Sequence, residues 1–276
     1  MARAFDALFA SKGAGVPRLL GVVHLAPLPG APGYDSAGGM TAILDSALGD
    51  AAALMQGGMA GLFVENFGDA PFWKDRVPPE TVAAMSRVAA ELRRAVPGPL
   101  GINVLRNDGA AALAVAAACE ADFIRVNVLS GAMVTDQGVI EGRAAELLRM
   151  RRALGCSALI LADVLVKHAA PLGATSLLQA AEDTWERAGA DALVLTGAGT
   201  GKPASLEEAA ALRKALPGAP LVVASGVTLD TVGAWLKACD AAIVGTWVKK
   251  NGKVSERVDP ARVKQLVETA ASGALL

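Results

Sequence analysis

Eight short apolar runs recur along the chain, and most of them are followed by a longer segment with helical periodicity. Continuous apolar strands that alternate with helices are typical of a parallel sheet whose two faces are both buried. We therefore expect eight βα units. The expected strands are Leu19–His24, Gly61–Glu65, Leu100–Val104, Asp122–Val128, Ala158–Val164, Ala192–Thr196, a run that begins at Pro220 and a run that begins at Cys239.

Capping residues and prolines mark the helices between these runs. Asp108 is placed to cap an alanine-rich helix, and Ser205 and Glu208 have the spacing of a capping box. After the last strand, Asn251-Gly252 favours a hairpin over residues 247–254. The expected helices are Met40–Gln56, Pro79–Ala95, 108–118, Glu141–Leu154, Thr175–Arg187, one that begins at Ser205, one between the last two strands and one from Asp259-Pro260 to about Ala271.

A two-strand alternation indicates how the units are arranged. Even-numbered strands follow helix ends of similar sequence, such as Cys119-Glu120-Ala121-Asp122 and Ala188-Gly189-Ala190-Asp191, whereas the third and seventh strands follow Pro-Gly turns. A barrel whose interior layers come from alternate strands has this alternation. An open doubly wound sheet shares it, but eight units without an edge-like strand favour closure. We therefore predict one α/β domain over residues 1–276, a (β/α)8 TIM barrel with an N-terminal extension at 1–16.

Composition and charge limit the classes of partner and the cellular compartment that we expect for this protein. Of the 276 residues, 53% are hydrophobic and 4% aromatic, so the core is built mainly from aliphatic side chains. A net charge of −1 provides no basic field for nucleic acid or an anionic membrane, and no apolar run reaches the ~20 residues of an integral membrane segment. Cys119, Cys156 and Cys239 are scattered, which fits a reducing cytoplasm. We expect a cytoplasmic protein and, because barrels often dimerise, a homo-oligomer.

The polar residues that end the apolar runs are the first candidates for function, because barrel enzymes place their active sites at the C-terminal ends of the strands. Any one of them alone can instead be a hydrogen-bonded structural residue. As a set, they predict a polar site at one mouth. The candidates are His24, Glu65, Asn103, Arg125, Asn127 and Asp163.

Arg125 and Asn127 are two residues apart on one strand, so they share a face, either the barrel interior or the helix layer. A buried arginine needs a carboxylate or an anion, and Glu65 and Asp163 are the nearest partners by strand position. One interpretation is a structural ion pair. The other is an arginine that fixes a substrate while a carboxylate moves a proton. Two carboxylates at one mouth can have separated pKa values, which would provide an acid and a base.

The two histidines and a lysine extend this set. His24 precedes a rigid Pro27-Leu28-Pro29 loop and is either an acid–base group or a loop anchor. Lys167 and His168 follow the fifth strand, and Lys167 is a further catalytic candidate. Because no close-spaced ligand pair exists, we predict no metal site, although a divalent metal on His24, Glu65 and Asp163 stays open.

Glycine-rich strand ends predict a phosphate site, which in such barrels lies after strands seven and eight. The loop from Gly197 to Lys202 is not a Walker A motif, since Pro203 stands where Ser or Thr would bind magnesium. It is either an anion-binding or lid loop, or a plain turn. The candidate phosphate-binding residues are Gly197, Gly199, Thr200, Gly201, Ser225, Gly226, Gly245 and Thr246.

Seven motifs, spread over residues 17–268, together resemble those of the BtpA family. They occur in the family's order, without departure at the motif positions. The motifs are Gly21-Val22-Val23-His24-Leu25-Ala26-Pro27-Leu28-Pro29-Gly30, Val64-Glu65-Asn66-Phe67-Gly68-Asp69-Ala70-Pro71-Phe72, Asn103-Val104-Leu105-Arg106-Asn107-Asp108, Phe123-Ile124-Arg125-Val126-Asn127-Val128, Ala162-Asp163-Val164-Leu165-Val166-Lys167-His168, Thr196-Gly197-Ala198-Gly199-Thr200-Gly201 and Ala224-Ser225-Gly226-Val227-Thr228.

The resemblance implies a TIM barrel whose phosphate end is similar to that of phosphoribosylanthranilate isomerase and other ribulose-phosphate-binding barrels. It leaves the reaction open, because His24 stands where the isomerase pattern has a catalytic Cys. The founding member of the family is linked to the accumulation of photosystem I in cyanobacteria. Related proteins, encoded beside bacterial sugar-uptake genes, are described only as predicted enzymes.

Three functional hypotheses follow. The first is an isomerase, lyase or N-glycoside hydrolase that acts on a small phosphorylated sugar or ribosyl compound, without a required cofactor. Asp163 and Glu65 would be its base and acid, with His24 in support, while Arg125, Asn103 and Asn127 would orient hydroxyls. The second is a non-catalytic biogenesis or stability factor that binds a partner through the loop of Phe67, Phe72 and Trp73. The third is an enzyme that binds flavin mononucleotide at the same phosphate end.

Overall fold

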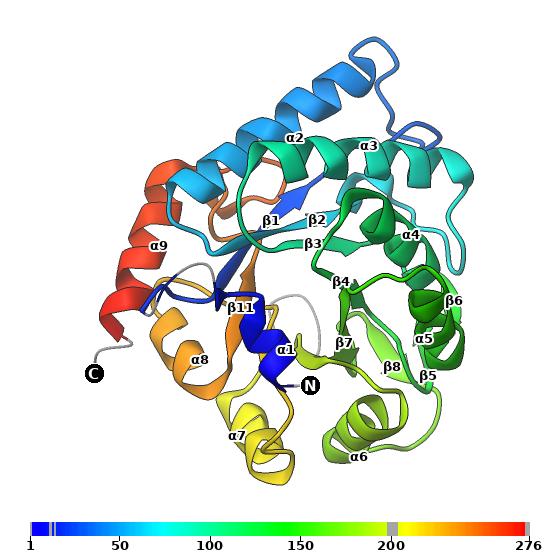
Figure 1. Ribbon diagram of the computed structural model, residues 1–276, viewed down its shortest axis with the longest axis vertical. Helices are drawn as coiled ribbons and strands as arrows, with labels where there is room; N and C mark the ends of the chain where they lie inside the picture. The colour runs from blue at the N-terminus through cyan, green and yellow to red at the C-terminus, as the bar shows by residue number, and fades with distance from the viewer. Residues whose placement is uncertain (1, 11–12, 14, 198–203, 274–276) are drawn as a thin grey trace.

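Eight parallel strands close into a barrel in this computed structural model, which describes residues 2–10, 13, 15–197 and 204–273 (Figure 1). Around the barrel the strand order is β1-β11-β10-β9-β7-β4-β3-β2. The predicted fold class is confirmed. The barrel strands are β1 (Leu19–His24), β2 (Gly61–Glu65), β3 (Leu100–Asn103), β4 (Phe123–Val126), β7 (Leu159–Val164), β9 (Ala192–Leu195), β10 (Leu221–Val223) and β11 (Ala241–Val244).

A ring of helices surrounds the barrel and buries its outer face (Figure 1). The predicted caps are confirmed: the Asp108 carboxylate accepts a hydrogen bond from Ala111 N, and Ser205 and Glu208 form a complete capping box. The ring contains α2 (Gly39–Gln56), α3 (Pro79–Ala95), α4 (Gly109–Cys119), α5 (Ala144–Ala153), α6 (Leu177–Glu182) with a π-helical continuation (Asp183–Arg187), α7 (Leu206–Ala215), α8 (Val232–Ala238) and α9 (Pro260–Gly273). No helix within the described ranges is both long and apolar enough to cross a membrane.

Large apolar side chains fill the middle of the barrel. The rings of Phe63 and Phe123 stack with 6.0 Å between centroids, and a side chain at Gly101 would collide with the Phe123 ring. Because side chains alternate between the two faces of a strand, residues two positions beyond these phenylalanines, Glu65 and Arg125, also point inward. The polar layer at the mouth therefore rests on a packed aromatic floor.

The N-terminal extension covers the opposite end of the barrel. It contains α1 (Ala2–Ala7), which lies across the opening at the N-terminal ends of the strands (Figure 1). Phe5 and Phe9 are buried and belong to the same apolar cluster as the inward side chains Leu20, Val22 and Phe63. The extension thus closes the barrel at the N-terminal ends of the strands.

A small antiparallel sheet lies outside the barrel, and its strands are not among those expected from the sequence. Its strands are β5 (Ala132–Thr135), β6 (Gly138–Glu141) and β8 (Ala169–Pro171), in the order β6-β5-β8. Met133 and Ile140 pack beneath it, while Val134 and Val139 are exposed. Strands this short carry too little alternation to be recognised by sequence pattern.

The segment after β11 differs from the predicted hairpin at 247–254. It contains a 3-10 turn at Lys250–Gly252 and a single antiparallel bridge between Lys249 and Val258. Lys249 turns inward because its ammonium group donates to the buried Asp50 carboxylate of α2 at 2.7 Å, and Arg257 Nε donates to the same carboxylate at 2.7 Å. This ion-paired cluster fixes the segment against α2 instead of pairing it with itself.

Candidate active site

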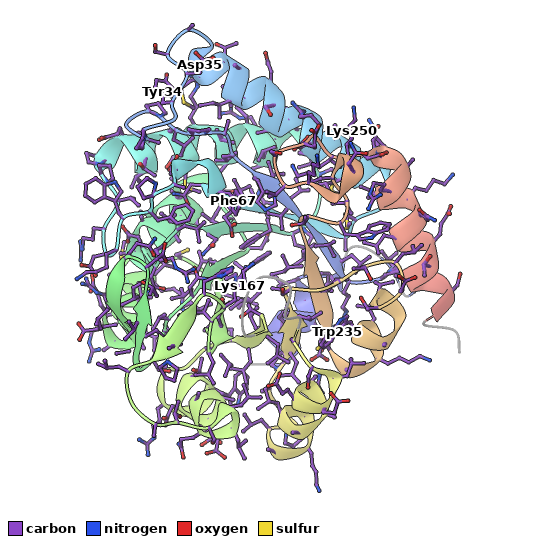
Figure 2. All side chains as sticks on the ribbon, turned by 180° about the vertical axis from the view of Figure 1, so that it is seen from behind. Tyr34, Asp35, Phe67, Lys167, Trp235 and Lys250 are labelled. Atoms are coloured by element: carbon purple, nitrogen blue, oxygen red, sulfur yellow. The ribbon has the colours of Figure 1, made fainter. Side chains whose placement is uncertain are left out.

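A cavity of about 380 Å³ opens at the C-terminal ends of the strands. This volume falls within the range of small-molecule sites in proteins. Phe67 from the loop after β2 and Lys167 from the loop after β7 lie near the barrel axis (Figure 2). The predicted residues that line the cavity are His24, Glu65, Arg125, Asn127, Lys167, Ser225, Gly226, Gly245 and Thr246, together with the neighbouring His168.

Arg125 and Asp163 form a buried ion pair just inside the mouth. Arg125 donates to the two carboxylate oxygens of Asp163 from Nε at 2.8 Å and from one terminal nitrogen at 2.9 Å. Asn127 Nδ2 donates to the same carboxylate at 2.9 Å. The Asp163 side chain is fully buried, and beside this carboxylate the pKa of Arg125 is raised even though its burial acts to lower it. Asp163 is therefore committed to holding Arg125 and Asn127.

Asn103 ends β3, in register with Glu65 of β2. Its side-chain amide donates to the carbonyl oxygen of Arg125 at 2.9 Å, with Asn127 Oδ1 at 3.4 Å from the same nitrogen. Asn103 is buried and is absent from the residues that line the cavity. Its contacts orient the strand that carries Arg125 and Asn127.

Glu65 is the carboxylate that faces the cavity. It ends β2 opposite His24 of β1, and only 9% of the residue is exposed. Among the described residues, its carboxylate has no hydrogen-bond or ion-pair partner at contact distance. Burial raises the pKa of Glu65, although Arg125 and Lys167 act in the opposite direction. Such a carboxyl group can hold or release a proton nearer to neutral pH than an exposed glutamate.

His24 is a neutral imidazole at the same level. Burial, followed by the charge of Lys249, lowers the pKa of His24 to about 3. Its ring contacts Phe67 edge-on, with 4.9 Å between centroids, and Gly245 leaves room for it, since a Cβ there would lie 2.8 Å from the ring. His24 Nδ1 is buried without a hydrogen-bond partner within the described chain. The ring can exchange hydrogen bonds with a ligand but does not supply a positive charge.

Two basic residues border the cavity without a carboxylate beside them. Arg106, in the loop after β3, is 7% exposed and donates to the carbonyl oxygen of Lys167 at 3.0 Å. Burial lowers the pKa of Arg106, and burial followed by the charge of Arg125 lowers that of Lys167. In the described residues, neither cation has a carboxylate within 4 Å. Sequence reasoning named Lys167, three residues beyond the end of β7, but missed Arg106, which lies equally far beyond the end of β3.

The loops after β10 and β11 line another wall of the cavity with small residues. Gly226 has φ +71°, which favours glycine, and its carbonyl oxygen accepts from Thr231 Oγ1. Ser225, Gly245 and Thr246 complete this wall. Gly197, with φ +72°, is the last described residue before the glycine-rich loop. Of the candidates for phosphate binding, Gly199, Thr200 and Gly201 lie outside the described residues.

A second group that sequence reasoning missed ties the front loops together. The buried Asp69 carboxylate accepts from Leu28 N at 2.8 Å and from Asn66 Nδ2 at 3.0 Å, and Asn66 Oδ1 accepts from Leu105 N at 2.7 Å. These bonds join the loops after β1, β2 and β3. In the described part of the chain, no three His, Cys, Asp or Glu side chains are grouped so as to hold a metal ion.

Fold and site together define a (β/α)8 barrel protein with a polar, ligand-sized cavity at its C-terminal mouth. The model of the BtpA family matches residues 17–272, and the chain belongs to this family. This finding confirms the resemblance that the sequence motifs carry.

Relatives and solved structures agree with this assignment. The photosystem I biogenesis protein BtpA of Synechocystis is 48% identical over 92% of this chain and 88% of its own. An uncharacterized protein of Thermococcus kodakarensis is 46% identical over 91% of this chain and 94% of its own. The N-(5'-phosphoribosyl)anthranilate isomerase of Pyrococcus furiosus has the same fold, with a TM-score of 0.57 at 12% identity over 93% of this chain and 99% of its own.

Proposed function

We propose that this protein is an enzyme that acts on a small phosphorylated sugar or ribosyl compound by acid–base chemistry. The observation that carries the proposal is Glu65, a carboxyl group with a raised pKa that faces a polar cavity of about 380 Å³ and has no hydrogen-bond or ion-pair partner among the described residues. An unpaired buried carboxyl group destabilises the folded protein, so its presence in a cavity indicates a functional role. Proton transfer at a ligand is such a role. Isomerisation, lysis and N-glycoside cleavage all require it.

The phosphate of the substrate would bind at the wall formed by Ser225, Gly226, Gly245 and Thr246. Small residues and a left-handed turn let backbone N–H groups approach an anion there. Gly197, Gly199, Thr200 and Gly201 remain candidates for the same role. The location after the last two strands is the usual phosphate site of such barrels.

The remaining residues would divide the work around Glu65. Glu65 moves the proton, and neutral His24 hydrogen-bonds a hydroxyl or carbonyl oxygen of the substrate. Arg125 and Asn127 orient the substrate from below, held in place by Asp163 and Asn103. In this scheme Asp163 positions its neighbours and is not a base, since both its oxygens accept hydrogen bonds.

Thermal stability in the presence of sugar phosphates tests the phosphate site. Ligand binding to the folded state should raise the Tm of the wild-type protein by an amount that grows with concentration. Ser225→Asp places a negative charge in the phosphate wall and should abolish the rise. Ser157→Asp, at an exposed position before β7 and at the other end of the barrel, is the matched control and should keep it. An unchanged Tm with every phosphorylated sugar would refute the proposal.

Turnover tests Glu65 itself. Glu65→Gln keeps the size and the neutral form of the side chain, so ligands that raise the wild-type Tm should still bind within about twofold. Conversion of phosphorylated sugars, followed by NMR, should fall by roughly 10²–10⁴-fold. A variant that converts substrate at the wild-type rate would exclude Glu65 as the proton-transfer group.

A role in assembly is the second candidate, and two observations favour it. One relative is named a photosystem I biogenesis protein, and Trp73 and Phe67 at the mouth are 61% and 40% exposed. Trp73→Ser should remove partner binding and leave sugar-phosphate binding intact.

A flavin enzyme is distinguished by absorbance, because purified protein that retains flavin is yellow.

A further inference from the structure

The cavity has two differently built walls, and they lie on opposite sides of the barrel. Gly226 follows β10, and Arg106 follows β3. In the closed strand order, β3 is four strands away from β10 in either direction, which is the far side of an eight-stranded ring. Both residues nevertheless line the same cavity. One small ligand can therefore contact both walls.

The side of the cavity formed by the loops after β3 and β7 carries positive charge that the described residues do not neutralise. Arg125 is matched by Asp163, but Arg106 and Lys167 have no carboxylate within 4 Å in the described part of the chain. Arg106 is more than nine-tenths buried, and within the described ranges its guanidinium makes one hydrogen bond, to a carbonyl oxygen. A buried cation without a counter-ion is unfavourable in the folded protein, so the site is built for a charge that arrives with the ligand.

The local backbone directs this pair toward the cavity. Leu165 and His168, on either side of Lys167, both adopt positive φ values, 50° and 59°. Lys167 N donates to Thr196 Oγ1 at 3.1 Å, and its carbonyl oxygen accepts from Arg106. Two hydrogen bonds thus hold the loop after β7, and Lys167 lies near the barrel axis (Figure 2).

We propose that the substrate carries a second anionic group, a phosphate or a carboxylate, which binds to Arg106 and Lys167 across the cavity from the first phosphate. The inference rests on the proposed function and makes it more specific. The substrate class becomes a sugar or ribosyl phosphate with an oxyanion at each end. Arg106 can pair with such a group through two parallel N–H donors, and Lys167 adds a point charge.

Matched ligand pairs test the second anion. Fructose 6-phosphate and fructose 1,6-bisphosphate differ by a phosphate, and glucose 6-phosphate and 6-phosphogluconate differ by a carboxylate. Isothermal titration should show that the wild-type protein binds the doubly anionic member of at least one pair roughly 10–100-fold more tightly, the contribution of charge-assisted hydrogen bonds. The pair that shows the preference identifies the second group.

Variants assign the preference to the proposed residues. Arg106→Gln can still donate to the carbonyl oxygen of Lys167 but should reduce the preference to less than about threefold, whereas Arg106→Lys should keep part of it. Arg152→Gln removes the same charge from the exposed surface of α5 and should leave the preference unchanged. Ser225→Asp should instead weaken both members of each pair.

The outcomes separate the inference from the proposed function. If the monophosphates bind and the second anion adds less than twofold in both pairs, the proposed function stands and the two-anion inference is wrong. The inference is also wrong if Arg106→Gln keeps the full preference. If no phosphorylated probe binds the wild-type protein, both fail together.

Discussion

Burial affects protein stability in opposite directions at Arg125 and Arg106, because only Arg125 has a carboxylate beside it among the described residues. Arg125 is fixed by two hydrogen bonds to Asp163, so its charge is neutralised inside the fold. Arg106 is equally buried, but among the residues that the structure describes its side chain has only a carbonyl oxygen as a partner. We infer that the first arginine stabilises the protein and that the second is retained at a cost to stability.

Unfolding measurements on two variants test this contrast. Arg125→Gln leaves the buried Asp163 carboxylate without its counter-ion, so the free energy of unfolding should fall by about 3–5 kcal/mol. Arg106→Gln removes an uncompensated charge and should leave that free energy unchanged or raised. Urea denaturation at pH 7 measures both. Equal losses in the two variants would show that Arg106 is structural.

His24 makes stability depend on pH. Its folded-state pKa of about 3 lies below the ordinary value of 6.5, so the folded protein disfavours the protonated ring. The stabilisation is fully present above pH 6.5 and is lost as the pH falls from 6.5 toward 3. Between pH 8 and pH 5 this amounts to about 2 kcal/mol.

In His24→Gln, which cannot take up this proton, the fall in unfolding free energy between pH 8 and pH 5 should be smaller by about that amount. His168→Gln, at the exposed histidine, is the control and should retain most of the wild-type fall. A His24→Gln profile parallel to that of the wild type would mean that the ring titrates normally in the folded protein.

The repeat noticed in the sequence has a physical cause at the level of the elements. Asp122, Asp191 and Asp240 precede β4, β9 and β11, and each carboxylate accepts from the backbone N–H at or near the start of the preceding barrel strand. Each also accepts from an arginine on the helix that leads into that preceding strand: Arg93 of α3, Arg151 of α5 and Arg213 of α7. The same clamp therefore joins two strands and a helix three times around the barrel.

Removal of one clamp should destabilise the fold according to its burial. Asp191 is the most buried of the three carboxylates, so Asp191→Ala should lower the free energy of unfolding by about 2–3 kcal/mol. Asp240→Ala, at the more exposed clamp, should cost about 1 kcal/mol. Thermal or urea unfolding measures the difference, and a larger loss at Asp240 would show that burial does not determine the effect.

The sequence predicted the elements well where the pattern is local, and less well where tertiary contacts decide. The strands that contain Leu20 and Leu62 are long apolar runs bounded by turns, and both were found at their observed limits. The hairpin expected at 247–254 was wrong because the buried Asp50, about 200 residues away in sequence, draws Lys249 inward. At the site, the candidates on the strands were found because polar residues end the apolar runs. Whether Arg125 and Asn127 face the interior could not be decided from sequence, and Arg106 lies in a loop, where the strand-end pattern does not apply.

The two ends of the barrel differ in polarity: the N-terminal end is filled with apolar side chains, and the C-terminal end carries the polar cavity. At the bottom, Phe5 and Phe9 of the N-terminal extension complete an apolar core inside the barrel. At the top, the same strands end in the polar cavity. Rigid apolar packing beneath a polar mouth keeps the site residues in fixed positions.

The N-terminal extension should stabilise the protein through the apolar side chains that it buries, Phe5 above all. Phe5 is 1% exposed, so Phe5→Ala should lower the free energy of unfolding by about 3 kcal/mol, near the lower end of the range for buried phenylalanines because the short helix can adjust. Val16→Ala, at an exposed position in the same extension, should have little effect. A Phe5→Ala variant as stable as the wild type would mean that the barrel does not need this helix.

Because the barrel is plugged beneath an aromatic floor, molecules cannot travel through it from end to end. A molecule that reaches Glu65 therefore enters and leaves through the opening at the C-terminal ends of the strands. If the protein is the enzyme proposed above, a product that stays bound at the wall of Ser225, Gly226, Gly245 and Thr246 blocks the next substrate, and we expect it to act as a competitive inhibitor in kinetic assays.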